Sequence, residues 1–398
     1  MWKKIIGISL TICSILVIGI IFYRGHDASR YQKMVDKPSD VKKWQADPRP
    51  LQTKADTLNQ LKKVVKDQGG KTLINKKNRH QIKTTVIPGL RGAWSINFKT
   101  KKAAFGTDWV PQGITQSDQS YFVSVYDGEK KLNSLIFQID KSSRKYIKTL
   151  ILPTKAHLGG ITYDQDHQQL IYSDDTHGNA GFGYLSQKQI DSYTASEAKA
   201  PIAAKHIDWS LGVRTSAITV YNHQMVVAKY GRNANERSII TLPLNKKGLP
   251  DPISRKESAE IFKKTSENDF KGLVQYLIKH HIINSYDKGR NRLQGVSVSD
   301  SEMAAFSQSN GDSPSKIWFQ VGENSGWSNL KFAATEGDSI ITVPHSAEGV
   351  SLSPDDKSLS IIFESGAKKY REGGSFTKRP TFMDRIVDIP INIKVEYK

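Results

Sequence analysis

Gln112-Gly113-Ile114-Thr115 is the stretch that decides the fold, because its pattern returns along the chain. Each copy combines a small or polar residue, a glycine, a β-branched apolar residue and a hydroxyl. The other copies are Gly159-Gly160-Ile161-Thr162, Gln294-Gly295-Val296-Ser297, Glu348-Gly349-Val350-Ser351 and a degraded one, Ser216-Ala217-Ile218-Thr219. Such a repeat indicates one structural unit that is built several times.

The residues after each copy indicate that the unit is a meander of strands. A polar, turn-rich stretch follows each copy and leads to a second β-rich run, for example residues 121–125, and in the first unit two further strands follow at 134–140 and 145–152. Four antiparallel strands per unit form the blade of a β-propeller. We therefore predict an all-β propeller over residues 105–398. A β-sandwich or two smaller β-domains would not place a glycine at one fixed point of each unit.

The copies of the repeat indicate the number of blades, and the longest gap between them indicates an insertion. Five copies are visible, and a sixth blade can be assembled from residues 84–87 together with residues 385–395. The sequence therefore predicts six blades, closed by both ends of the chain. Residues 255–286, in the longest gap, have apolar residues at near-helical spacing, which predicts a small helical insertion between the third and fourth blades.

The stretches 348–356 and 160–164 resemble the innermost strand and following turn of gluconolactonase-like and NHL-like propeller proteins. The resemblance covers roughly residues 105–398, is generic to the fold, and points to no specific family. In gluconolactonase-like hydrolases a divalent metal is held in the central channel by Glu, Asn and Asp side chains from several blades. The equivalent positions here contain one anionic residue, so we predict no metal and no cofactor; calcium is implied only if the protein is such a hydrolase.

A ligand site is predicted at the mouth of the channel. Glu348, ringed by Gln112, Gln294 and Ser216, would line a polar mouth that suits a hydroxyl-rich ligand. The alternative is that Glu348 caps backbone amides of a neighbouring strand. His157 and His345 both stand just before a repeat copy and are predicted to reach the same face. No nucleophile at a recognisable turn accompanies them, so no catalytic residue is assigned.

The loop 173–181 combines two carboxylates, an imidazole and two glycines, which superficially resembles a metal-binding loop. It lacks the alternating Asp ligands and the terminal bidentate Glu of a calcium loop. We interpret it as a turn that connects two strands of a blade.

The N-terminus predicts a membrane anchor. Residues 5–23 contain no charge and are long enough to cross a bilayer, and Trp2 and Tyr23 stand where interfacial aromatic residues belong. A cleaved signal peptide would require a site of small residues after Tyr23, and this site is not well formed. A lipoprotein signal would require small residues before Cys13, the single cysteine, and these are also lacking. We predict that residues 1–23 are an uncleaved transmembrane signal-anchor, which places the large domain outside the cytoplasm at the cell membrane.

The positive charge is concentrated next to this anchor. Residues 24–104 contain 20 Lys and Arg against 6 Asp and Glu, so they carry most of the net charge of +19, whereas residues 105–398 are nearly neutral. We predict a basic membrane-proximal stalk with one short helix over residues 24–104. It is either a solvated spacer or a contact for anionic lipid or an acidic wall polymer. Nucleic acid is not predicted as a partner.

These observations predict a membrane-anchored, extracytoplasmic propeller that acts as a binding or scaffolding module for a cell-envelope glycan, a wall polymer or a protein. The alternative is a metal-dependent hydrolase of lactone or ester bonds with its site in the channel.

Overall fold

The computed structural model describes residues 34–35, 37–74, 79–265, 269–299, 303–321, 339–372 and 381–391. The predicted transmembrane segment, residues 5–23, lies outside these ranges. Within them, no helix has the length and apolar character needed to cross a membrane.

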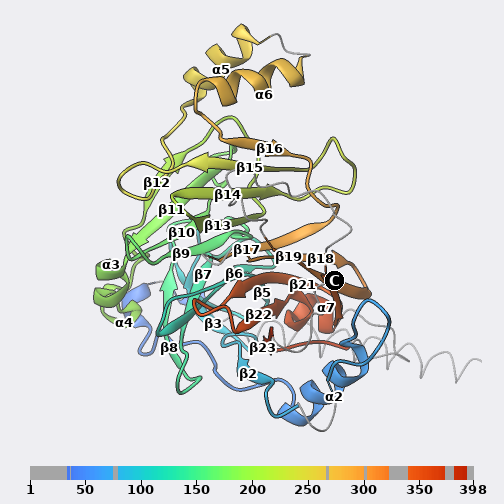
Figure 1. Ribbon diagram of the computed structural model, residues 1–398. Coiled ribbons are helices and arrows are strands. Elements are labelled where there is room, and N and C mark those ends of the chain that lie inside the picture. Colours follow the sequence, from blue (N-terminus) through green and yellow to red (C-terminus); the bar gives the residue numbers. More distant parts are fainter. Residues whose placement is uncertain are drawn as a thin grey trace, which may run out of the picture.

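The described residues form five four-stranded antiparallel sheets, each of which is one blade of a β-propeller (Figure 1). In every blade the first strand is the innermost. The first blade contains β5 (Trp109–Gln116), β6 (Ser120–Asp127), β7 (Leu135–Asp140) and β8 (Tyr146–Ile151); the second contains β9 (Ile161–Asp164), β10 (Gln169–Ser173), β11 (Gly181–Ser186) and β12 (Lys205–Asp208). The third contains β13 (Ala217–Tyr221), β14 (Gln224–Lys229), β15 (Ser238–Pro243) and β16 (Ser285–Asp287). The fourth contains β17 (Leu293–Val298), β18 (Met303–Asn310), β19 (Ser313–Val321) and β20 (Ser339–Val343).

The fifth blade is built from both ends of the chain. It contains β21 (Ala347–Leu352), β22 (Ser358–Phe363), β23 (Arg385–Pro390) and, at its outer edge, β2 (Lys83–Val86), which pairs with β23 so that Thr84 faces Val387. The prediction of six blades is therefore wrong. The segments reserved for a sixth blade, 84–87 and 385–395, instead supply the third and fourth strands of the fifth, because its own repeat unit provides only the two strands β21 and β22 before them.

The ring is closed, because each inner strand contacts the inner strands of both neighbouring blades: β5 contacts β9, β9 contacts β13, β13 contacts β17, β17 contacts β21 and β21 contacts β5. The hydroxyl of each repeat copy joins these strands. Thr115 Oγ1 accepts a hydrogen bond from the backbone amide of Tyr163 in the next blade at 2.9 Å. Three further bonds repeat this pattern: Val220 N to Thr162 Oγ1 at 3.1 Å, Val298 N to Thr219 Oγ1 at 3.5 Å and Leu352 N to Ser297 Oγ at 3.0 Å. At the closing contact the side-chain amide of Gln116 donates to Ser351 Oγ at 3.3 Å.

The glycine of the repeat allows the inner strands to approach one another. A Cβ atom on Gly349 would lie 2.6 Å from the amide nitrogen of Ile114, and one on Gly295 would lie 2.6 Å from the carbonyl oxygen of Glu348. Real Cβ atoms do not come this close to backbone atoms, so glycine is required at these positions. In the degraded copy Ala217 takes the place of the glycine.

A buried polar network ties the closing blade to the first. Asp388 on β23 accepts hydrogen bonds from Arg144 Nη1 at 2.5 Å, Tyr121 hydroxyl at 3.2 Å and Ser360 Oγ at 2.7 Å. Arg144 also donates to Thr85 on β2 at 2.6 Å. Burial, and then the charge of Asp388, raise the pKa of Tyr121 to about 12. The network thus joins the first blade to three strands of the fifth.

The segment that was expected to be a stalk packs against the propeller in its described part. Val41, Trp44 and Ala46 are buried in the same apolar cluster as the first blade. The segment also forms a small three-stranded sheet of β1 (Met34–Val35), β4 (Ala103–Gly106) and β3 (Ala93–Ile96). The short 3-10 helix η1 (Pro38–Asp40) precedes this contact.

The expected short helix corresponds to α2 (Lys54–Val64), which begins with a capping box between Thr53 and Asp56. Its Leu61, followed by Val65 and Ile74, is buried against the fourth and fifth blades. Lys66 exchanges backbone hydrogen bonds with Thr342, so the segment covers the outer edge of β20.

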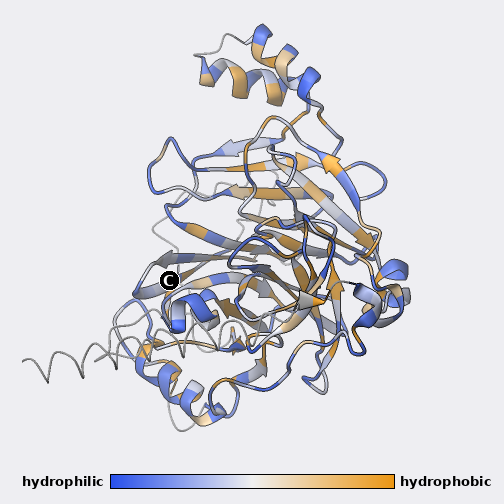
Figure 2. Cartoon of the chain, turned by 180° about the vertical axis from the view of Figure 1, so that it is seen from behind, coloured by the Kyte–Doolittle hydropathy of each residue, from blue (hydrophilic) through white to orange (hydrophobic). Residues whose placement is uncertain are grey.

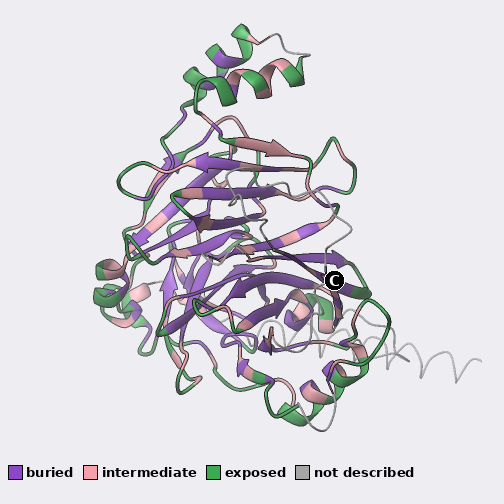
Figure 3. Cartoon of the chain, in the orientation of Figure 1, coloured by how far each residue is buried: buried purple, intermediate pink, exposed green. Residues whose placement is uncertain are grey.

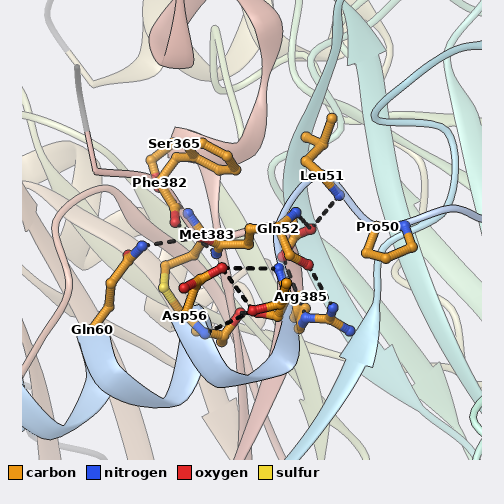
Figure 4. Close-up of polar contacts among 12 residues, drawn as sticks. Pro50, Leu51, Gln52, Asp56, Gln60, Ser365, Phe382, Met383 and Arg385 are labelled. Carbon is orange, nitrogen blue, oxygen red and sulfur yellow. Dashed lines mark hydrogen bonds and ion pairs between the residues drawn. The ribbon is translucent and has the colours of Figure 1, made fainter.

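Hydrogen bonds also join the chain just before α2 to residues at the start of β23 (Figure 4). The amides of Leu51 and Gln52 donate to Asp384 Oδ2 at 2.6 and 3.0 Å, and Arg385 Nη2 donates to the carbonyl oxygen of Gln52 at 2.9 Å. The described N-terminal segment therefore belongs to the folded body.

The helical insertion between the third and fourth blades consists of α5 (Arg255–Lys264) and α6 (Phe270–Lys279). Figure 1 shows that the two helices stand apart from the blades. Figure 3 shows that the helices are largely exposed, whereas the strands of the blades are largely buried. Orange apolar residues occur on both helices in Figure 2. The shorter helices α3 (Gln187–Ser192), α4 (Ala195–Ala198), η3 (Glu364–Gly366) and α7 (Lys368–Arg371) lie in connections between strands or blades.

Candidate ligand site at the channel mouth

A polar cavity of about 420 Å³ opens at the end of the channel where the inner strands begin. Every blade contributes to its lining. The residues are Gln112, Lys130, Lys155, Ala156, His157, Gly159, Asp175, Thr176, Arg214, Thr215, Ser216, Tyr230, Gln294, Glu348 and Glu364. The structure thus brings together five of the six residues that the sequence proposed for a ligand site: Gln112, His157, Ser216, Gln294 and Glu348. Their role in binding remains a prediction.

His345, the sixth residue, does not line this cavity. Its Nε2 lies 2.8 Å from the carbonyl oxygen of Thr381, and its Nδ1 lies 3.0 Å from Ser346 Oγ. The imidazole is therefore engaged with the chain that leads into β23.

A pair of glutamates forms the floor of the mouth. Glu348 begins the inner strand of the fifth blade and is buried, and its side chain is hydrogen-bonded to that of Glu364, which follows β22. Burial and the charge of Glu364 raise the pKa of Glu348 well above its usual value. Glu364 is the acceptor of the pair, because Tyr370 hydroxyl at 2.6 Å and Gln112 Nε2 at 3.3 Å also donate to its Oε1. Burial raises the pKa of Glu364 as well, so the two adjacent carboxyl groups favour a state in which they share a proton.

Aromatic groups and one lysine enclose this pair. The ring of Tyr126 lies 4.4 Å from the ring of His157, centroid to centroid, and its hydroxyl accepts a hydrogen bond from Lys369 Nζ at 2.7 Å. Desolvation beside the mouth, and then the charges of Lys130, Lys369 and Arg214, lower the pKa of His157 to about 4. Both causes disfavour the charged imidazole, although the side chain is exposed toward the cavity.

The rim of the mouth is cationic. Lys130, Lys155 and Arg214 are exposed and come from three different connections, whereas Asp175 is the one acid of the lining besides the glutamate pair. Burial raises the pKa of Asp175. Burial disfavours the charged forms of Glu348, Glu364 and Asp175, so the three rim cations dominate the charge of this mouth. The arrangement attracts anionic groups and presents amide, hydroxyl and imidazole groups to them.

Calcium, which the alternative function would require, does not fit this donor set. Calcium binds six to eight oxygen ligands, several of them carboxylates. Here the two adjacent carboxyl groups share a proton, Glu364 is already bonded to Tyr370 and Gln112, and Lys369 is close to both. The cationic rim would also repel a divalent cation.

The opposite end of the channel is a less favourable site. A cavity of about 150 Å³ is lined there by the ends of the inner strands, including Thr115, Thr162, Thr219, Ser297 and Ser351. Four of these hydroxyls already accept a backbone amide from the neighbouring blade, which leaves less of their hydrogen-bonding capacity for a ligand.

Sequence reasoning missed Glu364, although a usable signal was present. In an antiparallel hairpin the start of the first strand and the end of the second lie at the same edge. The residues that end or follow the second strands, Tyr126, Asp175, Tyr230 and Glu364, therefore reach the same mouth as the residues that begin the inner strands. Lys369 and Tyr370 have no such positional signal, because they arrive on α7.

No family model matches the chain, and no curated protein matches it either. Solved structures with a similar fold include hydrazine synthase from Kuenenia stuttgartiensis, at 12% identity over 64% of this chain and a TM-score of 0.32; this chain spans 55% of its length. A PQQ-bound aldose sugar dehydrogenase from Streptomyces coelicolor is 14% identical, with 71% of this chain and 78% of that chain covered and a TM-score of 0.36.

A chain of a nidogen/laminin complex is 11% identical, with 68% and 84% covered and a TM-score of 0.36. Likeness at this level concerns the fold alone. The predicted fold-level resemblance to β-propeller proteins, without a specific family, is confirmed by the strand order and the closed ring.

Proposed function

We propose that this protein is a binding module whose ligand occupies the channel mouth, and that the ligand is hydroxyl-rich and carries negative charge. The observation that supports the proposal is the convergence of side chains from all five blades on one polar cavity with a cationic rim. Ligand sites are concave and contain a few converging polar groups, and this mouth has both properties. Tyr230 in the lining supplies an aromatic ring that suits the apolar face of a sugar ring.

In the cell, this ligand would be an acidic glycan or wall polymer of the envelope. The uncharged stretch of residues 5–23 supports a membrane anchor with the propeller outside the cytoplasm. Lys42, Lys43, Lys62 and Lys63 are exposed on the N-terminal segment, which supports an additional contact with anionic lipid or with the same polymer. Such a contact should weaken steeply between low and physiological salt; binding to anionic vesicles that does not change with salt would contradict it.

The test uses the full chain in detergent, a panel of acidic and neutral glycans, and substitutions at the rim. Lys130→Gln and Arg214→Gln should each weaken binding of an acidic glycan by roughly tenfold, since each removes one charge-assisted contact. Lys145→Gln is the matched control, because Lys145 is exposed just before β8 and does not line the mouth. Unchanged binding in both rim variants, or preference for neutral glycans, would refute the proposed ligand class.

One observation favours a hydrolase as the second candidate. The Glu348–Glu364 pair brings two buried carboxyl groups with raised pKa values side by side, and such groups can take part in general acid–base chemistry. The same panel, extended by lactones and esters, separates the two functions. A binding module leaves its ligand intact, whereas hydrolysis that is lost in both Glu348→Gln and Glu364→Gln would assign the pair to catalysis.

A further inference from the structure

A cluster of two histidines and one aspartate lies on the second blade, away from the glutamate pair. His177 is in the loop between β10 and β11, and His206 and Asp208 are on β12. Their nearest ligand atoms all lie within 4.8 Å of one another. His206 and Asp208 are two positions apart on one strand, so their side chains share a face of the sheet.

The distances within the cluster match those between ligands of one metal ion. Asp208 Oδ1 lies 3.2 Å from His206 Nε2 and 3.4 Å from His177 Nδ1. In a tetrahedral zinc site with bonds of about 2.0–2.1 Å, neighbouring ligand atoms are about 3.3–3.4 Å apart. The two imidazole rings are tilted by 56° to each other, with their centroids 4.3 Å apart.

The surroundings hold His206 in the orientation that a ligand needs. Its second ring nitrogen, Nδ1, faces Asp174 Oδ2 at 3.4 Å, and Asp174 is buried and fixed by Thr154 Oγ1 at 2.8 Å. A carboxylate behind a histidine is the usual outer contact of metal-binding imidazoles. Gly181, opposite Asp208 in the sheet, leaves room for the ring: a Cβ atom there would lie 2.8 Å from His206 Cε1.

We propose that His177, His206 and Asp208 bind one transition-metal dication, with Zn²⁺ as the best match, and that water completes the coordination. Two imidazoles and one carboxylate are ligands that zinc accepts and that calcium or magnesium do not prefer. The ion joins the β10–β11 loop to β12. The same loop supplies Asp175 and Thr176 to the channel mouth, so the metal would also fix one wall of that cavity.

The full chain, prepared without a polyhistidine tag and treated with EDTA, is titrated with ZnCl₂ by calorimetry and with Co²⁺ by visible absorption. We expect one Zn²⁺ per chain and the d–d bands of tetrahedral Co²⁺. Asp208→Asn, His177→Gln and His206→Gln should each weaken binding at least about tenfold, and Asp174→Asn roughly 10–100-fold through the orientation of His206. His80→Gln, at an exposed histidine outside the cluster, should bind as the unsubstituted protein does.

The side chains of His177 and Asp208 are 58% and 55% exposed, so their variants will fold even if the His206 variant does not. Binding that is equal in the cluster variants and the unsubstituted protein, or less than one equivalent in the latter, would overturn the site.

Discussion

At the scale of single residues, the glutamate pair dominates the electrostatics of the channel mouth. The pKa of Glu348 is raised well above its usual value, because the carboxyl group is buried and its ionisation would place a negative charge beside Glu364. Glu364 stays the acceptor because Tyr370 and Gln112 donate to it. The mouth therefore carries less negative charge than its carboxyl groups suggest.

This pair predicts a dependence of stability on pH. Since the pKa of Glu348 is raised in the folded state, the folded protein binds more protons than the unfolded chain above pH 4.5, and its stability falls as the pH rises through this range. Glu348→Gln mimics the protonated carboxyl, so it should flatten this decline and raise the melting temperature at pH 8 more than at pH 4. Thermal unfolding across pH 4–9 measures the effect. Parallel pH profiles for the two proteins would contradict the shared proton.

At the scale of elements, the fold depends on how neighbouring inner strands are joined. The repeated glycine brings their backbones together, and the repeated hydroxyl accepts an amide from the next blade. Both parts of the sequence pattern thus act between blades rather than within one.

Thr162→Val should destabilise the protein by about 1–3 kcal/mol, because it keeps the shape of the side chain but leaves the amide of Val220 without its acceptor. Thr72→Val is the control, since Thr72 is exposed, and it should change stability by less than about 0.5 kcal/mol. Urea unfolding of both variants provides the measurement. Equal stability of the two would mean that the hydroxyl does not join the blades.

The sequence allowed the repeat, the inner strands, the helical insertion and five residues of the mouth to be predicted, because each depends on a local pattern. Two features could not be read in this way. The pairing of β2 with β23 joins strands with ordinary alternation at opposite ends of the chain, so the sequence could not tell a completed fifth blade from a sixth. Likewise, Glu364 belongs to the mouth because it lies next to Glu348, and this neighbourhood depends on the hairpin of β21 and β22.

At the scale of the whole molecule, the N-terminal segment is part of the folded body. Leu61, Val65 and Ile74 are buried against the last two blades, and the chain before α2 is bonded to Asp384 and Arg385. The positive charge that looked like a stalk therefore lies, from residue 37 onward, largely on the surface of the propeller.

Truncation from the N-terminus should reveal this packing in two steps. A chain that begins at residue 80 retains β2 but loses α2, so it should remain folded with a lower melting temperature than one that begins at residue 37. A chain that begins at residue 87 loses β2, exposes the edge of β23 and should aggregate. Calorimetry and size-exclusion chromatography of the three chains measure this. Equal melting temperatures for the first two would show that the segment contributes nothing to stability.

The position of β2 also affects the order in which the blades can form during synthesis. During synthesis β2 appears early, but its partner β23 follows about 300 residues later. At roughly 5–20 residues per second, the strand waits roughly 15–60 s before it can pair. Blades one to four can form meanwhile, whereas the fifth blade stays incomplete until β23 is made. A nascent chain arrested before residue 385 would therefore contain four complete blades and a fifth blade that has only its two inner strands, β21 and β22.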